Sequence, residues 1–155
     1  MLQEINRKRI SFAVLFWCLT AICMGIIFYF SAQPYNLSDG QSSFVLQLIK
    51  RLFFWAEPTS FIVRKAAHFT EYAGLCLLLN CSLLFSFGRI KPLTAFLFAS
   101  LYAVTDEIHQ FFVEGRSCQL TDWVVDSIGA FAGAAAFLAI YLILKKISEK
   151  RRIIK

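Results

Sequence analysis

The chain has 155 residues, of which 58% are hydrophobic and only 17% are charged, and its mean hydropathy is +0.61. Soluble globular domains have about 45–50% apolar and about 25% charged residues, so the composition argues against an ordinary soluble domain and favours a membrane protein. The net charge of +6 does not indicate a nucleic-acid partner, because the basic residues flank apolar runs.

The first apolar run covers residues 10–30, carries no charge and follows the basic residues Arg7, Lys8 and Arg9. A helix of about 20 apolar residues crosses a membrane. The run is longer than the roughly 7–15 residues of a signal-peptide core, and Phe30-Ser31-Ala32 is a poor cleavage site. We therefore predict a retained first span over about 10–30. It should end before Pro34, because the residue preceding a proline is disfavoured in α-helical geometry.

The segment between the first two long apolar runs has a helical pattern of its own. Ser38 and Asp39 are suited to cap a helix, and apolar residues recur at helical spacing within 44–55. We predict an amphipathic interfacial helix over about 40–55, lying on the outer leaflet. Thr59 and Ser60 then follow Pro58 and provide a cap for the next long helix.

Three further apolar runs predict spans over about 66–87, 92–113 and 122–144. We therefore expect an all-α, polytopic integral membrane protein with four transmembrane helices, forming one domain over residues 1–155. Cys18, Cys23, Cys76 and Cys81 lie inside the apolar runs, where they act as small apolar residues. No Cys-x-x-Cys spacing occurs, which argues against a thiolate metal site.

The basic residues predict the orientation of these spans. One side of the predicted topology holds Arg7, Lys8, Arg9, Arg89, Lys91, Lys145, Lys146, Lys150, Arg151, Arg152 and Lys155. The other side holds Lys50, Arg51, Arg64, Lys65 and Arg116. Lys and Arg accumulate in short cytoplasmic segments. Both termini are therefore expected inside, in a multi-pass protein of the cytoplasmic membrane.

The polar residues within the apolar runs gather near the predicted outer ends of the spans. They are Arg64, Lys65, His68, Glu71 and Tyr72 in the second run, Asp106, Glu107, His109 and Gln110 in the third, and Asp122 and Asp126 in the fourth. A charged side chain facing lipid at the centre of a helix costs about 2.5–3.5 kcal/mol. We therefore expect these residues to face one another around a polar pocket that opens outward. Gly129-x-x-x-Gly133 below it predicts close helix packing.

The same residues resemble the motifs of the VanZ-like family. The matching patterns are Ser31-x-Gln33-Pro34, Lys65-x-x-His68-x-x-Glu71-Tyr72, Asp106-Glu107-x-x-Gln110-x-Phe112-x-x-Gly115-Arg116 and Asp122-x-x-x-Asp126-x-x-Gly129. The family usually has Asn where this chain has Asp126. The resemblance implies a bacterial cell-envelope protein associated with low-level resistance to teicoplanin, in a family without an established biochemical activity.

Two classes of function remain open at this point. In the first, the pocket binds an anionic or amphiphilic ligand, such as a membrane lipid, a lipid-linked cell-wall precursor or a lipoglycopeptide. The ligand-binding candidates are Lys65, His68, Glu71, Tyr72, Asp106, Glu107, Gln110, Arg116, Asp122 and Asp126. In the second, the protein is an intramembrane enzyme acting on a lipid-linked substrate, with His68, Glu71 and Glu107 as catalytic candidates.

A metal-dependent form of the enzyme would use His68, Glu71, Asp106 and Asp122 or Asp126 as ligands, but the leading interpretation requires no metal and no cofactor. A purely structural alternative assigns the same residues to scaffolding. Asp122 would then cap its helix, Arg116 would pair with Glu107 or Asp122, and Tyr72 would serve in packing. His109, which lies outside the family motif, would serve as a partner for Asp106.

Overall fold

A computed structural model describes residues 2–34, 37, 40, 47 and 59–153. Within these residues the fold is all-helical, as predicted, with α1 over Leu2–Ser31, α3 over Ser60–Phe87, α4 over Pro92–Gln110 and α5 over Leu120–Ile153. The interfacial helix predicted over 40–55 lies outside the described residues, apart from the isolated positions 40 and 47.

Local sequence signals fix most of the helix ends. Thr59 caps α3 by accepting a hydrogen bond from the backbone nitrogen of Ile62 at 3.3 Å. Gly88 ends that helix in the left-handed conformation with φ 69°, which glycine adopts without steric cost. Pro92 occupies the first turn of α4, where its missing N–H is not needed. The helix α4 ends at Gln110, so residues 111–113 form a turn and do not continue the helix as predicted.

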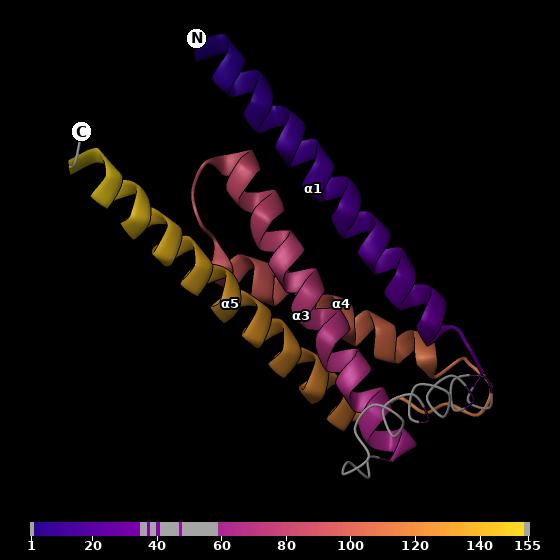
Figure 1. The fold of residues 1–155 in the computed structure, drawn as a ribbon. Helices are drawn as coiled ribbons and strands as arrows, with labels where there is room; N and C mark the ends of the chain where they lie inside the picture. Colours follow the sequence, from indigo (N-terminus) through magenta and orange to yellow (C-terminus); the bar gives the residue numbers. More distant parts are fainter. Residues whose placement is uncertain (1, 35–36, 38–39, 41–46, 48–58, 154–155) are drawn as a thin grey trace.

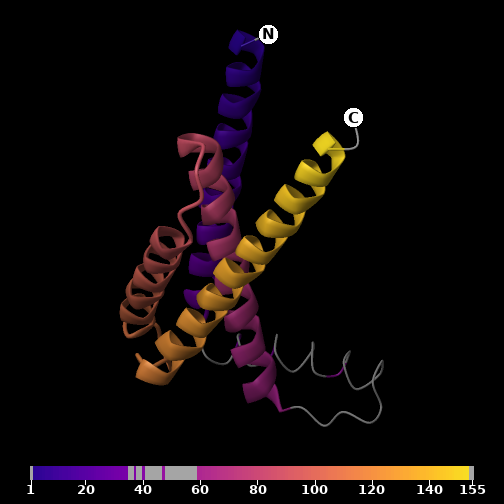
Figure 2. The ribbon, with the colours of Figure 1, turned by 90° about the vertical axis from the view of Figure 1, so that its left-hand side faces the viewer.

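The helix α3 lies at the centre of the bundle, with α1 on one side and α5 on the other (Figures 1 and 2). Its packing against α5 is the most extensive in the fold. A Cβ atom built on Gly129 would overlap the backbone of Phe69, and one built on Gly133 would overlap the backbone of Ala73. The predicted small-residue face of the fourth run is therefore confirmed as the surface on which α3 and α5 approach closely.

The shorter helix α4 also packs through small side chains. Ala95, Ala99 and Ala103 are spaced four residues apart on one face, and each is completely buried. The opposite face exposes large apolar residues, including Leu93 and Leu101. Such a face is unusual on a soluble monomer and is typical of a surface in contact with lipid.

Three helical segments are long and apolar enough to cross a membrane, namely Arg7–Ser31, Ser60–Phe87 and Leu120–Arg151. The helix α4 is not among them. Its last turns contain Asp106, Glu107, His109 and Gln110, which lower its hydropathy. Three of the four predicted spans thus meet the criterion of length and composition, whereas the fourth span and the orientation stay predictions.

Both termini lie at the same end of the bundle (Figure 1). The opposite end brings together the last turn of α1, the first turns of α3, the last turns of α4 and the first turns of α5. The polar residues that the sequence placed near the outer ends of the spans therefore meet at the end away from the termini.

Candidate functional site

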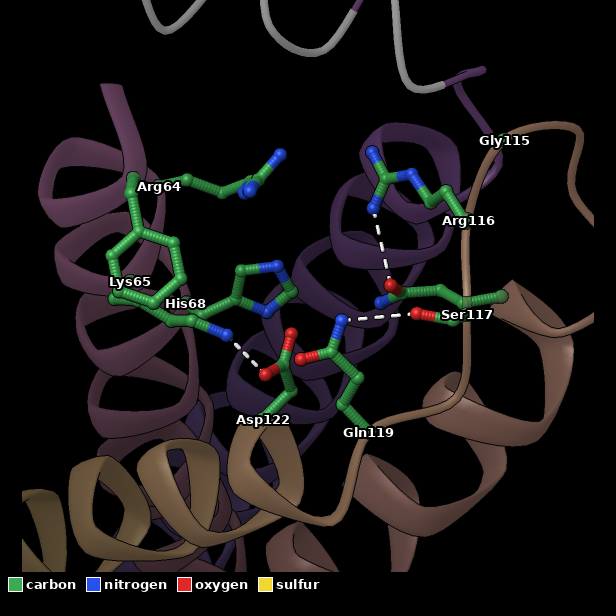
Figure 3. A pocket seen from close by; sticks show the side chains of 10 residues that line it. Arg64, Lys65, His68, Gly115, Arg116, Ser117, Gln119 and Asp122 are labelled. Carbon is green, nitrogen blue, oxygen red and sulfur yellow. Dashed lines mark hydrogen bonds and ion pairs between the residues drawn. The ribbon is translucent and has the colours of Figure 1, made fainter. Parts of the chain in front are cut away.

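A cavity of about 90 Å³ lies at this end of the bundle (Figure 3). It is lined by Phe61, Arg64, Lys65, His68, Gln110, Gly115, Arg116, Ser117, Gln119 and Asp122. Its walls come from α3, from the end of α4, from the 111–119 loop and from the start of α5. Five of the predicted ligand-binding residues, Lys65, His68, Gln110, Arg116 and Asp122, line this pocket.

Positive charge dominates the pocket. Arg64, Lys65 and Arg116 line it, and among the described lining residues only Asp122 carries a carboxylate. Figure 3 shows the side chains of Arg64 and Arg116 entering from opposite walls toward the same open centre. Burial and the positive charge of Arg64 both lower the pKa of Arg116. The lining therefore has an excess of cationic groups around an open space.

Lys65 is held in a defined place. Its ammonium group forms an ion pair with Asp122, and both side chains are mostly buried. The same ammonium lies 5.1 Å from the centre of the Phe61 ring, within the range of a cation–π contact. Asp122 also accepts a hydrogen bond from Thr121. Its carboxylate therefore positions Lys65. Because Asp122 lies in the first turn of α5, the carboxylate is also at the positive end of that helix dipole, in line with the structural alternative.

Arg116 is anchored by neutral oxygen atoms. Its Nε donates to the carbonyl of Gln33 at 2.9 Å, and its Nη2 donates to the carbonyl of Phe30 at 3.3 Å. Phe30 lies in the last turn of α1, which ends at Ser31, and a guanidinium is favourable at the negative end of a helix dipole. Gly115 precedes Arg116 with φ 73°, the left-handed conformation that suits glycine. These contacts hold the end of α1 and Gln33 beside the pocket.

Gln110 connects Arg116 to a buried carboxylate. Arg116 Nη1 donates to Gln110 Oε1 at 3.2 Å, and Gln110 Nε2 donates to Asp106 Oδ2 at 3.1 Å. Asp106 and Gln110 are each only 3% exposed. Hydrogen bonds therefore run from the pocket wall into the interior, and Asp106 and Gln110, four residues apart in α4, share one face of that helix.

Glu107 lies in α4 and contacts the start of α5. Its Oε2 accepts a hydrogen bond from the backbone nitrogen of Gln119 at 2.9 Å, directly before α5 begins. Backbone N–H groups at a helix start have no partner within the helix, so this carboxylate stabilises the entry into α5 from α4. Glu107 and Asp122 thus have their own partners, and neither pairs with Arg116 as the structural alternative suggested.

His68 stands between the pocket and the interior. Its Nδ1 lies 3.3 Å from Oδ1 of Asp126, whose side chain is completely buried. The two atoms are within ion-pair distance without meeting hydrogen-bond geometry, and neither carboxylate oxygen of Asp126 has a hydrogen-bond partner in the described part of the chain. Figure 3 shows the His68 ring with its other nitrogen turned toward the open centre of the pocket.

The remaining predicted residues lie deeper or elsewhere. Tyr72 is completely buried, and its hydroxyl has no hydrogen-bond partner among the described residues. Glu71 follows His68 by one helical turn, is partly buried and is not among the lining residues of the pocket. The ring of His109 packs on that of Phe28, with centroids 4.3 Å apart, and is not a partner of Asp106.

The sequence did not point to Phe61, Ser117 and Gln119, which also line the pocket. Ser117 and Gln119 are joined by a hydrogen bond of 2.9 Å, and both lie in the loop before α5. Their residue types are common in loops, and no periodicity marks them. The described residues contain no group of three or more His, Cys, Asp or Glu side chains arranged to hold a metal ion, so the metal-dependent alternative has no preformed site there.

The model of the family described as VanZ/LLP1 matches residues 16–144, which includes part or all of every helix that builds the pocket. The chain belongs to the VanZ/LLP1 family. The resemblance drawn from the sequence motifs is thereby confirmed. Neither a curated protein nor a solved structure matches the chain.

Every residue that lines the pocket lies within the match to the VanZ/LLP1 family. The match begins within α1 and ends within α5, while the assignment of residues 1–155 to a single domain stays a prediction. In this VanZ/LLP1 protein, the carboxylate next to His68 is that of Asp126. An ionised carboxylate at a fully buried position is unfavourable unless a polar group compensates it, and Nδ1 of His68 is the group within reach.

Proposed function

We propose that this protein binds the anionic head of an amphiphilic envelope ligand in the pocket at the end of the bundle away from the termini. The observation that carries the proposal is the convergence of Arg64, Lys65 and Arg116 around one small cavity. The carboxylate of Asp122 is already paired with Lys65, so the lining retains a net positive charge. Arg and Lys in such a setting bind phosphate or carboxylate groups by charge-assisted hydrogen bonds.

The size of the cavity restricts the part of the ligand that enters. About 90 Å³ is several times the space that one water molecule requires, and far less than a lipid or a glycopeptide occupies. A single phosphate or carboxylate group fits these dimensions. The hydrophobic part of the ligand would remain outside the pocket, against the exposed apolar faces of the helices.

The proposed membrane topology has four spans, with both termini in the cytoplasm. Its support comes from the basic residues at the terminal end of the bundle and from the exposed apolar face of α4. In this orientation the pocket opens at the outer leaflet of the bacterial cytoplasmic membrane. Lipid-linked cell-wall precursors and lipoglycopeptides both present anionic groups there. By family membership, we propose that ligand binding contributes to resistance against glycopeptides of the teicoplanin type.

The test measures binding and protection with the same variants. Purified protein in nanodiscs is titrated with dihexanoyl phosphatidic acid and, for comparison, with dihexanoyl phosphatidylcholine, and the shift in melting temperature is recorded. Phosphatidic acid should raise the melting temperature of the wild-type protein. Arg64→Gln should lose at least most of that shift, because one of the converging cations is gone.

Arg89→Gln is the matched control, since Arg89 is exposed in the turn at the other end of the bundle. It should bind like the wild type. In cells, Arg64→Gln should lower the minimum inhibitory concentration of teicoplanin, and Arg89→Gln should not. Equal responses to both lipids, or equal behaviour of the two variants, would refute an anion-binding role for the pocket.

A further inference from the structure

We propose that the pocket is the active site of a phosphohydrolase for lipid phosphate monoesters, with His68 as the nucleophile and Asp126 as the residue that positions it. This inference rests on the proposed function, because the phosphate must first bind among Arg64, Lys65 and Arg116. It goes beyond binding, since it assigns a covalent reaction to the site.

The two ring nitrogens of His68 face different surroundings, as a nucleophilic histidine requires. One ring nitrogen, Nδ1, lies 3.3 Å from Asp126, while the other, Nε2, is turned toward the open centre of the pocket. A carboxylate at Nδ1 fixes the tautomer that leaves Nε2 unprotonated, and it stabilises the positive charge that develops on the ring. Asp126 is completely buried and has no hydrogen-bond partner among the described residues, so none of them competes with His68 for its carboxylate.

The cations lie where a phosphoryl group next to Nε2 would need them. Arg64 and Lys65 come from the same first turns of α3 as His68, and Arg116 enters from the opposite wall (Figure 3). In phosphoryl transfer, catalysis depends mainly on positioning and on compensating the charge that spreads over the phosphoryl oxygens. Three cations around one cavity and one oriented imidazole supply both.

The reaction balances without a metal or any additional reactant besides water. Nε2 of neutral His68 forms a bond to phosphorus as the bond from phosphorus to the ester oxygen breaks, and the departing alkoxide takes a proton from solvent at the open mouth of the pocket. The phosphohistidine keeps its Nδ1 proton, facing the Asp126 carboxylate. Water then attacks phosphorus and loses a proton to solvent, and Nε2 leaves with its electron pair. The sum is a phosphate monoester and water giving an alcohol and inorganic phosphate.

The Asp122 carboxylate could also attack phosphorus, but it is held in its ion pair with Lys65. Ser117 is a further side chain in the lining that could act as a nucleophile. Its hydroxyl oxygen accepts a hydrogen bond from Gln119 Nε2 at 2.9 Å, and it lies on the loop wall, away from His68 in Figure 3. No described contact places a base against it. The geometry therefore favours His68.

Replacing Asp126 by Asn tests the charge of this residue separately from its hydrogen bonding. A neutral amide can accept a hydrogen bond from Nδ1 but cannot compensate a positive ring. Asp126→Asn should therefore retain phosphate binding and lose turnover. We expect kcat to fall by about 100-fold or more while KM stays within about threefold, by comparison with the loss seen when a catalytic triad loses its carboxylate.

The experiment uses the full chain in nanodiscs with dihexanoyl phosphatidic acid as the substrate, and inorganic phosphate release is measured. A non-hydrolysable phosphonate analogue of the same lipid measures binding separately. His68→Gln should abolish phosphate release and keep phosphonate binding. His109→Gln is the matched control, because it removes the other histidine of the chain, which packs on Phe28 outside the pocket. It should keep turnover within about twofold. Melting temperatures verify that each variant is folded.

The outcomes separate the two proposals. Phosphate release that depends on His68 supports both, and a phosphoenzyme trapped with ³²P should be labile in acid and stable in alkali, as a phosphohistidine is. A label that is stable in acid and lost in alkali would indicate phosphoserine and overturn the assignment to His68. Phosphonate binding without phosphate release would overturn the phosphohydrolase and leave the binding function intact. Absence of phosphonate binding would overturn both.

Discussion

Arg116 donates a hydrogen bond from Nη1 to the side-chain oxygen of Gln110, 3.2 Å away. The amide nitrogen of Gln110 in turn donates to Asp106, so one neutral side chain joins a cation in the pocket wall to a buried carboxylate. This relationship gives a physical reason for the polar residues at the end of an otherwise apolar helix. They tie α4 to the 111–119 loop and, through Arg116, to the end of α1.

Replacing Gln110 by Leu should destabilise the protein, because both of these hydrogen bonds are lost. Asp106 would remain buried with neither oxygen bonded, and such a loss costs about 1–3 kcal/mol. The melting temperature in detergent measures the effect. Adding Asp106→Asn to Gln110→Leu should recover part of the loss, because an amide is less costly to bury unpaired than a carboxylate. Equal stability of Gln110→Leu and the wild type would show that the connection contributes nothing.

Replacing Gly133 by Leu should prevent normal packing of α5 on α3. Even the Cβ atom would overlap the backbone of Ala73, and a backbone cannot move aside as a flexible side chain can. We expect a loss of about 3 kcal/mol or more, or failure to accumulate. Gly74→Ala is the matched control, since nothing lies within 4 Å of its Cβ position in α3, and it should be neutral or slightly stabilising. Folded-protein yield by size-exclusion chromatography and the melting temperature distinguish the two variants.

Glu107→Ala and Glu107→Gln should differ in stability. Alanine removes the acceptor for the Gln119 backbone nitrogen, and the loss of a helix-start contact costs about 0.5–2 kcal/mol. Glutamine keeps an oxygen acceptor at the same place and should retain most of the stability. If Glu107 is instead a catalytic acid or base, Glu107→Gln should lose phosphate release despite normal stability. Our assignment to structural support predicts that release continues.

Cys118 reports the side of the membrane on which the pocket opens. It is exposed in the loop between α4 and α5. A membrane-impermeant maleimide applied to spheroplasts should label the wild type and should not label Cys118→Ser. Lys150→Cys, placed on the Cys118→Ser background near the C-terminus, should be labelled only after the membrane is opened. The reverse pattern would invert the topology and place the pocket on the cytoplasmic side.

The sequence by itself determined the class of fold and much of the composition of the site. Runs of apolar residues specify membrane helices, because unpaired polar groups in lipid are costly, and Pro34, Thr59, Gly88 and Pro92 fix helix ends through local backbone geometry. Because polar groups facing lipid are costly, the sequence also predicted that the polar residues would face one another. Lys65, His68, Gln110, Arg116 and Asp122 were accordingly found in one pocket.

Only the tertiary structure decided which of these residues are partners. Sequence spacing gives neighbours on one helix, such as Asp106 and Gln110, but the pairs Lys65 with Asp122, His68 with Asp126 and Glu107 with Gln119 join different elements. The first two pairs depend on the crossing of α3 and α5, which the glycines at 129 and 133 allow by admitting the backbone of α3. The sequence predicts that these polar residues share a pocket, because polar groups facing lipid are costly. Which of them become partners depends on how closely the helices approach.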